Sequence, residues 1–406
     1  MYIRSISKII AAIVVVFIII AIIGIFYLYN SDTFGSSIRS GYIPITIYNT
    51  QNIPTPAPFQ QDIAICNGTN NIGPNFAYVS NSTLFNKINP NGQNVYFVNS
   101  YGNILYSWYE GQLIVNNTYC DVWWINLPNG IPANSNVIIY MYIGNSSADY
   151  YQQYYPYVGT NAQVVGTMQY DNGQDVFIAY GYFYNTSDGW NWYVYLGSGS
   201  PKTTIYGMEI SFIFGGSAYA LPPNNWNIPK IPLIVEEAWY YNPGTEINAI
   251  SLFGDTNDQK VFFALVSNLS TGSSFFSSYG RIYLISKVTN RVLNSTAFYF
   301  LSEGTIYSYL IVNSTYAQTG YYIYSPFSFT WAPLILLNTY TYTVYNSANL
   351  NIGISGYTYA NLNYNPFQYG TLEIGAEVGA GSYQYVEWII TRAYPPNGVM
   401  PSIYIG

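Results

Sequence analysis

The chain has 406 residues, carries a net charge of −7 and contains no histidine. Only 7% of its residues are charged, against about 25% in an average soluble protein. The lack of histidine excludes histidine-based catalysis and histidine-ligated metals, and the lack of a Lys and Arg excess argues against nucleic acid as a partner. Half of the residues are hydrophobic, which is enough to build sizeable cores and argues against a disordered chain.

The first 40 residues predict a membrane anchor. Residues 9–29 read IIAAIVVVFIIIAIIGIFYLY, a run of 21 residues without a charge. As a helix this run would be about 31 Å long, which matches the hydrocarbon core of a bilayer. Arg4 and Lys8 precede it, so the positive-inside rule leaves the N-terminus in the cytoplasm. We therefore expect a cytoplasmic tip and single-pass anchor at residues 1–29, a stalk at 30–40, and extracellular domains after it.

Two other leaders stay open for the same segment. A cleaved signal peptide has an apolar region of about 7–15 residues and a small-x-small cleavage site, whereas this run is longer and no such site closes it. A pilin-type leader needs a small residue after the basic charge, where this chain has Ile9 after Lys8.

Export predicts two covalent modifications. Cys66 and Cys120 are the only cysteines, and outside the cell two lone cysteines usually pair; the alternative is two separate buried thiols. Sequons of the form Asn-x-Ser/Thr all follow the apolar run, although an Asn- and Ser-rich chain also makes them by chance. The predicted glycosylation sites are Asn67, Asn81, Asn116, Asn145, Asn185, Asn268, Asn294 and Asn313.

After residue 40 the sequence predicts an all-β protein. Short β-branched and aromatic runs such as Val95–Asn99, Ile104–Trp108 and Val137–Ile143 are separated by turn residues, which is typical of β-sandwiches. No stretch shows a convincing helical period with caps. The Tyr-rich segment at 150–165 breaks the alternation, so we expect one sandwich at residues 41–158 and a second at 159–406.

Several stretches carry a family resemblance. The segments NVYFVNSYGNILYSWYEG and CDVWWINLPNGIPANSNVIIYMYIGNSSA resemble an uncharacterised β-sandwich module of archaeal and bacterial surface proteins, with Glu110 and Gly144-Asn145 at the expected places. The segments MQYDNGQDVFIAYGYFYNTSDGW and LEIGAEVGAGSYQYVEWIITRAYPPNGVMPSI resemble the two ends of a concanavalin/laminin-G-like sandwich. Glu387 stands where that pattern more usually has Asp. The resemblance implies two jelly-roll or concanavalin-like domains in an exported recognition or adhesion protein, and it transfers no catalytic residue.

Two kinds of functional site are candidates on such a fold. A glycosidase needs two carboxylates about 5–10 Å apart. Glu236 and Glu237 are adjacent, so on a strand they face opposite ways, and Glu373 and Glu377 are spaced about 13 Å along a strand. A pair across strands, such as Glu209 with Glu377, stays open.

A calcium site is the second possibility. The loop residues Asp255, Asn257 and Asp258 offer the oxygen ligands that Ca²⁺ prefers, although the same pattern forms ordinary Asx turns. We expect no other cofactor.

The functional prediction depends mainly on the 48 tyrosines of the chain. The residues Tyr150, Tyr151, Tyr154, Tyr155 and Tyr157 cannot all be core, and tyrosine suits contact with sugars and proteins; the alternative is that tyrosine is simply the generic outer residue of a low-charge sheet. We expect a non-enzymatic surface protein that binds glycans or surface proteins. The alternatives are a self-assembling subunit of an archaeal surface layer, pilus or virus particle, and a secreted glycoside hydrolase. With so few charges to lose, we also expect the exterior to tolerate acid.

Overall fold

The computed structural model describes residues 41–68, 77–115, 118–197, 199–212, 216–223, 229–241, 247–254, 262–268, 278–286, 291–300, 304–326, 344–345, 356–363, 365, 371–378 and 382–406. In these residues the chain is mostly β-sheet, which confirms the predicted all-β class. Within the described parts, no helix is long and apolar enough to cross a membrane. The predicted anchor at residues 9–29 and the stalk at 30–40 lie outside the described residues.

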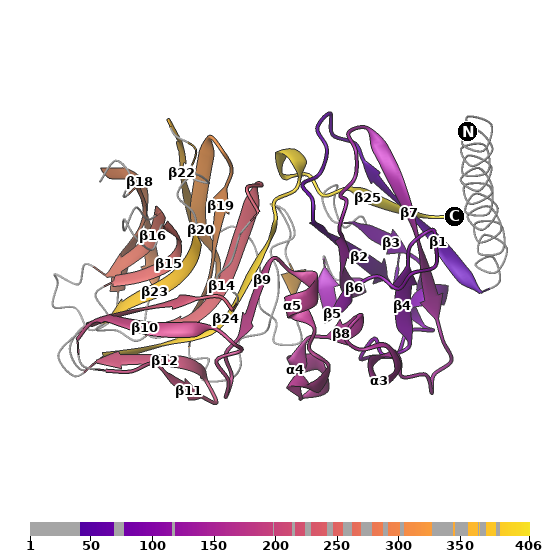
Figure 1. The fold of residues 1–406 in the computed structure, drawn as a ribbon, viewed down its shortest axis with the longest axis horizontal. Coiled ribbons are helices and arrows are strands. Elements are labelled where there is room, and N and C mark those ends of the chain that lie inside the picture. The colour runs from indigo at the N-terminus through magenta and orange to yellow at the C-terminus, as the bar shows by residue number, and fades with distance from the viewer. Residues whose placement is uncertain are drawn as a thin grey trace, which may run out of the picture.

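The first half of the molecule contains two sheets, which we call sheet I and sheet II (Figure 1). Sheet I has the order β25-β1-β7-β4, and sheet II has the order β21-β5-β6-β2-β3 with β8 added beside β5. The strands are β1 (Tyr42–Asn49), β2 (Phe59–Cys66), β3 (Tyr78–Ser80), β4 (Val95–Val98), β5 (Ser107–Val115), β6 (Thr118–Leu127), β7 (Ser135–Ile143), β8 (Val158–Thr160), β21 (Val344–Tyr345) and β25 (Ser402–Ile405).

The second half contains sheet III and sheet IV. Sheet III has the order β11-β12-β24-β14-β19-β20-β22 with β9 beside β24, and sheet IV has the order β10-β13-β23-β15-β16-β17-β18. The strands are β9 (Ala179–Tyr182), β10 (Asn191–Leu196), β11 (Lys202–Thr204), β12 (Gly207–Phe212), β13 (Gly216–Leu221), β14 (Leu233–Tyr241), β15 (Ile247–Gly254), β16 (Phe262–Asn268), β17 (Ser278–Ser286), β18 (Arg291–Phe300), β19 (Gly304–Val312), β20 (Tyr316–Pro326), β22 (Gly356–Asn361), β23 (Thr371–Val378) and β24 (Ser382–Ala393).

The helices in the described residues are short and lie in connections. The segment between the two halves holds several of them, where the sequence predicted a break in the strand pattern. They are α2 (Ser82–Phe85), α3 (Tyr150–Tyr154), α4 (Ala162–Val165), η1 (Met168–Tyr170), α5 (Gly173–Val176) and η3 (Pro396–Gly398). Asn81 and Asp149 accept hydrogen bonds as N-caps of α2 and α3, which satisfies backbone N–H groups that a short helix leaves unpaired.

Strand alternation explains how sheet II packs on two neighbours. Trp123 and Trp124 are adjacent on β6, so they point to opposite faces. The ring of Trp123 contacts Phe97 of sheet I, with centroids 5.8 Å apart, while the ring of Trp124 lies 4.7 Å from the guanidinium of Arg392 on β24. Both tryptophans are buried. Sheet II is therefore the central layer between sheet I and sheet III.

The domain boundary at 158/159 needs correction at two points, because the chain returns to the first half. The prediction placed residues 159–406 in the second sandwich. In the structure β25 pairs with β1, with Ile403 opposite Ile47, and β21 pairs with β5. Figure 1 shows the C-terminal segment crossing from β24 to β25. The two halves are consequently joined by these returns of the chain as well as by packing.

Candidate functional site

The junction between the halves is a buried apolar surface. One continuous hydrophobic cluster includes Ile63 of sheet II together with Ile234, Tyr309 and Ile390 of sheet III. A separate cluster between sheets III and IV contains Val235, the residue next to Ile234. Sheet III is thus buried on both faces at β14, β19 and β24. One face of these strands packs against the first half of the molecule, and the other packs against sheet IV.

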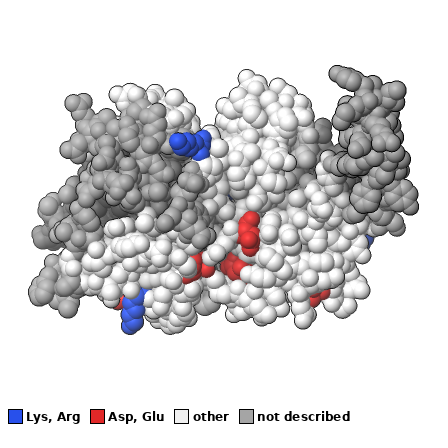
Figure 2. Space-filling view, viewed as in Figure 1, with Lys and Arg blue, Asp and Glu red and all other residues white. Residues whose placement is uncertain are grey.

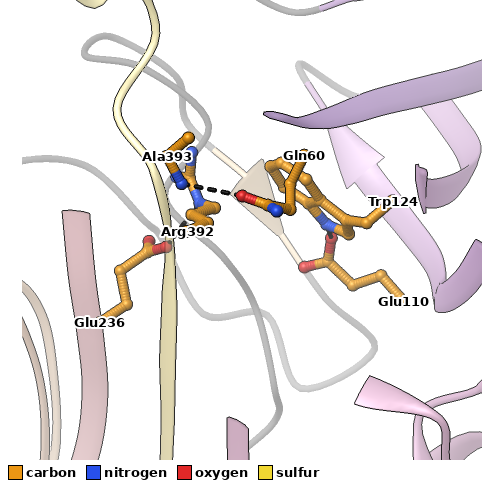
Figure 3. A network of polar contacts seen from close by, with 6 residues as sticks. All are labelled: Gln60, Glu110, Trp124, Glu236, Arg392 and Ala393. Carbon is orange, nitrogen blue, oxygen red and sulfur yellow. Dashed lines mark hydrogen bonds and ion pairs between the residues drawn. The ribbon is translucent and has the colours of Figure 1, made fainter. Parts of the chain in front are cut away.

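A polar network is set into this junction (Figure 3). Arg392 of β24 pairs with Glu236 of β14, with Nε and Oε2 2.9 Å apart and both side chains almost wholly buried. The backbone N–H of Ala393 donates to Oε1 of Gln60 on β2 at 2.8 Å. Moving a charge out of water costs free energy, which is offset only when the buried charge is paired and hydrogen-bonded. Here the Arg392–Glu236 ion pair gives each charge its partner.

Sheet II contributes a second part of the network. The indole N–H of Trp124 donates to Oε2 of Glu110 at 2.7 Å, and the face of the same indole lies against Arg392. A guanidinium over a tryptophan ring is attracted by the ring quadrupole. Glu110, which the module resemblance singled out, therefore holds the tryptophan that contacts the other half.

The structure places two of the candidate catalytic carboxylates on β14. Glu236 is the partner of Arg392, and Glu237, its neighbour on β14, points to the opposite face, as strand alternation predicts. Burial raises the pKa of the Glu237 carboxyl well above its usual value. Glu387 is also buried; its two oxygens accept hydrogen bonds from the hydroxyls of Tyr184 and Thr305.

The remaining candidate carboxylates lie on two different sheets, and the pair of Glu209 with Glu377 stays a prediction. Glu209 lies on β12 of sheet III and accepts a hydrogen bond from Ser211. Glu373 and Glu377 lie on β23 of sheet IV, where their backbones pair with Leu252 and Ile247. The side chains of Glu373 and Glu377 lie outside the described part.

Asp121 and Asp171 are two aspartates that the sequence analysis did not identify. Asp171, which precedes α5, accepts hydrogen bonds from the indole N–H of Trp108 at 3.0 Å and the hydroxyl of Tyr180 at 2.6 Å. Asp121 of β6 accepts one from the hydroxyl of Tyr109 at 2.5 Å. Burial raises the pKa of Asp171 to about 6 and that of Asp121 to about 7, although the hydrogen bonds act in the opposite direction. These hydrogen bonds tie strands and loops together.

The Tyr-rich segment divides as predicted between core and surface. Tyr151 of α3 is buried, with 2% of its surface exposed, and its hydroxyl donates to the carbonyl of Asn91 at 2.6 Å. Tyr155 and Tyr157 are 45% and 44% exposed. Exposed tyrosines therefore lie beside half-buried ones at this end of the first half.

Sheet I presents an aromatic cluster next to α3. The ring of Tyr96 contacts Tyr142, Tyr150 and Tyr154, with centroids 4.8–5.2 Å apart. Its hydroxyl lies 2.8 Å from that of Tyr42. Burial, together with Tyr42, Tyr154 and Tyr150, raises the pKa of Tyr96 far above its usual value, so this hydroxyl stays uncharged.

Charge is scarce on the visible surface as well. Figure 2 shows a face on which nearly all described atoms belong to uncharged residues, with acidic groups near the middle and only isolated basic ones.

The structure shows the predicted disulfide and places several of the predicted glycosylation sites. Cys66 and Cys120 stand opposite each other on β2 and β6 and are joined by a disulfide. Among the sequons, Asn67, Asn145 and Asn185 are exposed. Asn294 is exposed too, but its amide donates to the carbonyl of Tyr359 at 2.8 Å.

Other sites are less open or not described. Asn81 and Asn313 are partly buried, and Asn268 ends β16. Asn116 lies outside the described residues, as do Asp255, Asn257 and Asp258 of the calcium loop. Among the described side chains no group of three or more Cys, Asp or Glu residues is placed to hold a metal ion.

Comparison with known proteins gives one relative from a virus. No family model matches the chain. It is 29% identical over 407 aligned residues to Uncharacterized protein 562 of Sulfolobus islandicus rod-shaped virus 1, and the match covers 92% of this chain. The chain spans 61% of the length of that viral protein.

Solved structures give only distant likenesses. The lectin UEA-II in complex with galactose has a TM-score of 0.33 at 7% identity, over 52% of this chain and 97% of that one. The CBM2 module of the evolved Dit of Lactobacillus casei BL23 phage J-1 has a TM-score of 0.31 at 9% identity, over 53% and 94%. Scores this low carry no argument about function, and the concanavalin-like module stays an expectation from the sequence.

Proposed function

We propose that this chain is a non-catalytic recognition protein that binds glycans or surface proteins through tyrosine-rich faces. The observation that carries the proposal is the contrast between its carboxylates and its tyrosines. Glu236, Glu237 and Glu387 are buried. Tyrosines of both halves, such as Tyr119 of β6 and Tyr357 of β22, are exposed. Aromatic rings with a polar edge are the side chains most used for recognition.

The junction supports a fixed arrangement of the two halves. Binding surfaces on rigid elements lose less entropy when they bind than surfaces on loosely tethered domains. The contact of Arg392 with the Trp124 ring, the Ala393–Gln60 hydrogen bond and the pairing of β25 with β1 all join the halves. We therefore propose that the tyrosine faces keep a fixed relative position.

The proposal includes the compartment expected from the sequence. Residues 9–29 would anchor the chain in the membrane, and the sequons would carry glycans on the exported domains. The disulfide between Cys66 and Cys120 supports an oxidising location.

A second function is favoured by the viral relative. A match that covers 92% of this chain supports a structural subunit of a virus particle, in which the aromatic cluster of Tyr42, Tyr96 and Tyr142 would contact another subunit. Such a subunit would self-associate as its concentration rises.

One experiment separates the two functions. The full chain, purified in detergent micelles, is applied to a glycan array with and without Ca²⁺, and the same sample is measured by size-exclusion light scattering. A monomer with reproducible glycan signals supports recognition. Concentration-dependent oligomers without a glycan signal would replace it with the structural function.

A further inference from the structure

A row of three tyrosines lies at the edge of sheet III. Tyr316 of β20 and Tyr359 and Tyr357 of β22 follow one another, with ring centroids 6.0 Å and then 6.4 Å apart. Adjacent rings are inclined by 30° and 27°. Tyr357 and Tyr359 are each 51% exposed, while Thr358 between them is buried. The strand thus places its aromatic residues on one open face, and Figure 1 shows β20 and β22 side by side.

The row is supported from beneath. The hydroxyl of Tyr316 donates to the side-chain oxygen of Gln318, and the amide of Gln318 donates to the hydroxyl of Tyr309 at 2.8 Å. Gln318 stands directly opposite Tyr359 in the sheet and is buried like Tyr309. The side-chain amide of Asn294 on β18 donates a hydrogen bond to the backbone carbonyl of Tyr359. The rings are therefore held in place before any ligand arrives, which lowers the entropy lost on binding.

The described groups that act on Tyr316 are uncharged. Burial raises the pKa of Tyr316 to about 12, and the groups that raise it further are the tyrosines Tyr394, Tyr357 and Tyr359. No carboxylate is among these neighbours in the described structure. The hydroxyl of Tyr316 consequently keeps its proton, and an ionic ligand finds no opposite charge among these described neighbours.

We propose that this tyrosine row binds a neutral polysaccharide, with successive sugar rings lying on successive tyrosines. The two near-equal spacings suit a ligand built of repeated units, and flat rings with polar edges suit sugars, whose faces are apolar and whose rims carry hydroxyls. The inference rests on the proposed recognition function and names its ligand class and its place.

The test is affinity electrophoresis of the full chain, in detergent, through gels that contain an unbranched glucan, a mannan, or the charged polysaccharides alginate and pectate. The wild-type chain is expected to be retarded by a neutral polymer. Tyr359→Ala, at the centre of the row, should weaken that binding about tenfold or more, which corresponds to about 1.4 kcal/mol. Tyr359→Phe should keep most of it, because stacking needs the ring.

One control variant and one second variant of the row accompany this test. Tyr119→Ala removes a tyrosine of the first half that is 50% exposed, and it should leave binding unchanged. Tyr357→Ala serves as a second variant at the end of the row if Tyr359→Ala does not fold by its thermal midpoint.

The outcomes separate this site from the general function. Equal retardation of the wild-type chain and both row variants overturns the site and leaves glycan recognition standing. Stronger retardation by the charged polymers overturns the ligand class. Failure to bind any glycan, here and on the array, overturns both the site and glycan recognition.

Discussion

Arg392 and Glu236 form an ion pair at 2.9 Å that is buried between the two halves of the molecule. They are 156 positions apart in the sequence. On the adjacent strands β24 and β14 they lie diagonally, because Arg392 is directly opposite Ile234, two positions before Glu236. The pair places two opposite charges where the rest of the junction is largely apolar. Its contribution can be measured by removing each charge separately and then both.

Replacing either partner alone should destabilise the chain strongly. Arg392→Met or Glu236→Met leaves the opposite charge buried without the group that faces it, which costs about 3–5 kcal/mol in free energy of unfolding. The double variant Glu236→Met/Arg392→Met should recover most of that loss, because apolar groups of similar volume often replace a buried pair without penalty. Chemical denaturation of the three variants gives the values. Equal losses in the single and double variants would show that the pair is not coupled.

Glu237 should behave in the opposite way to its neighbour. It is buried, and its Oε2 has no hydrogen-bond partner among the described residues. Glu237→Met removes a poorly satisfied carboxyl, and we expect a gain of about 1–3 kcal/mol in free energy of unfolding. The same denaturation experiment measures it. A loss comparable to that of Glu236→Met would mean that Glu237 has a structural partner of its own.

The disulfide should contribute substantially to stability. Cys66 and Cys120 are 54 positions apart, and closing a loop of that length is worth about 4 kcal/mol in the chain-entropy model. Cys66→Ser/Cys120→Ser should lower the midpoint of thermal unfolding. Reduction of the wild-type chain should lower it by a similar amount, while the reductant should leave the double variant unchanged. Peptide mass mapping without reduction identifies the bridge directly, and free thiols there would contradict it.

Stability should fall as the pH rises from about 4 to about 7. The pKa of Asp121 is raised to about 7 and that of Asp171 to about 6, against about 3.9 in an unfolded chain. Between these values the folded chain holds protons that the unfolded chain has released, so raising the pH favours unfolding. The stabilisation is complete below about pH 4 and is lost as the pH passes the folded pKa values.

Asp121→Asn tests the origin of this slope. The asparagine keeps an oxygen that can accept from the hydroxyl of Tyr109 but cannot titrate. Thermal midpoints measured from pH 3 to pH 8 should therefore change less with pH in the variant than in the wild-type chain. A wild-type chain that becomes more stable between pH 4 and pH 7, or that unfolds below pH 4, would contradict both this account and the expected tolerance of acid.

The strands were predictable because the local pattern decides them. The Val137–Ile143 run lies within β7, and the opposite directions of Glu236 and Glu237 followed from strand alternation alone. The return of β25 to β1 was not predictable, because pairing between residues 403 and 47 depends on the fold of everything between them.

The junction was missed for a related reason. Arg392 interrupts the apolar run WIITRA of β24, and a charge at a core position was the available signal for a buried partner. Nothing local identifies Glu236 as that partner. The tyrosine row likewise depends on β20 and β22 being neighbours, whereas composition alone showed only that tyrosine is abundant.

The measurement that tests the central claim most directly is calorimetric titration of the strongest glycan from the array into the full chain, followed by analysis of the recovered glycan. The account predicts saturable heat with a fixed stoichiometry and a glycan recovered at its original length. A glycan recovered in shorter pieces would make the protein a hydrolase. The absence of heat from a chain that self-associates would contradict recognition and make it a structural subunit.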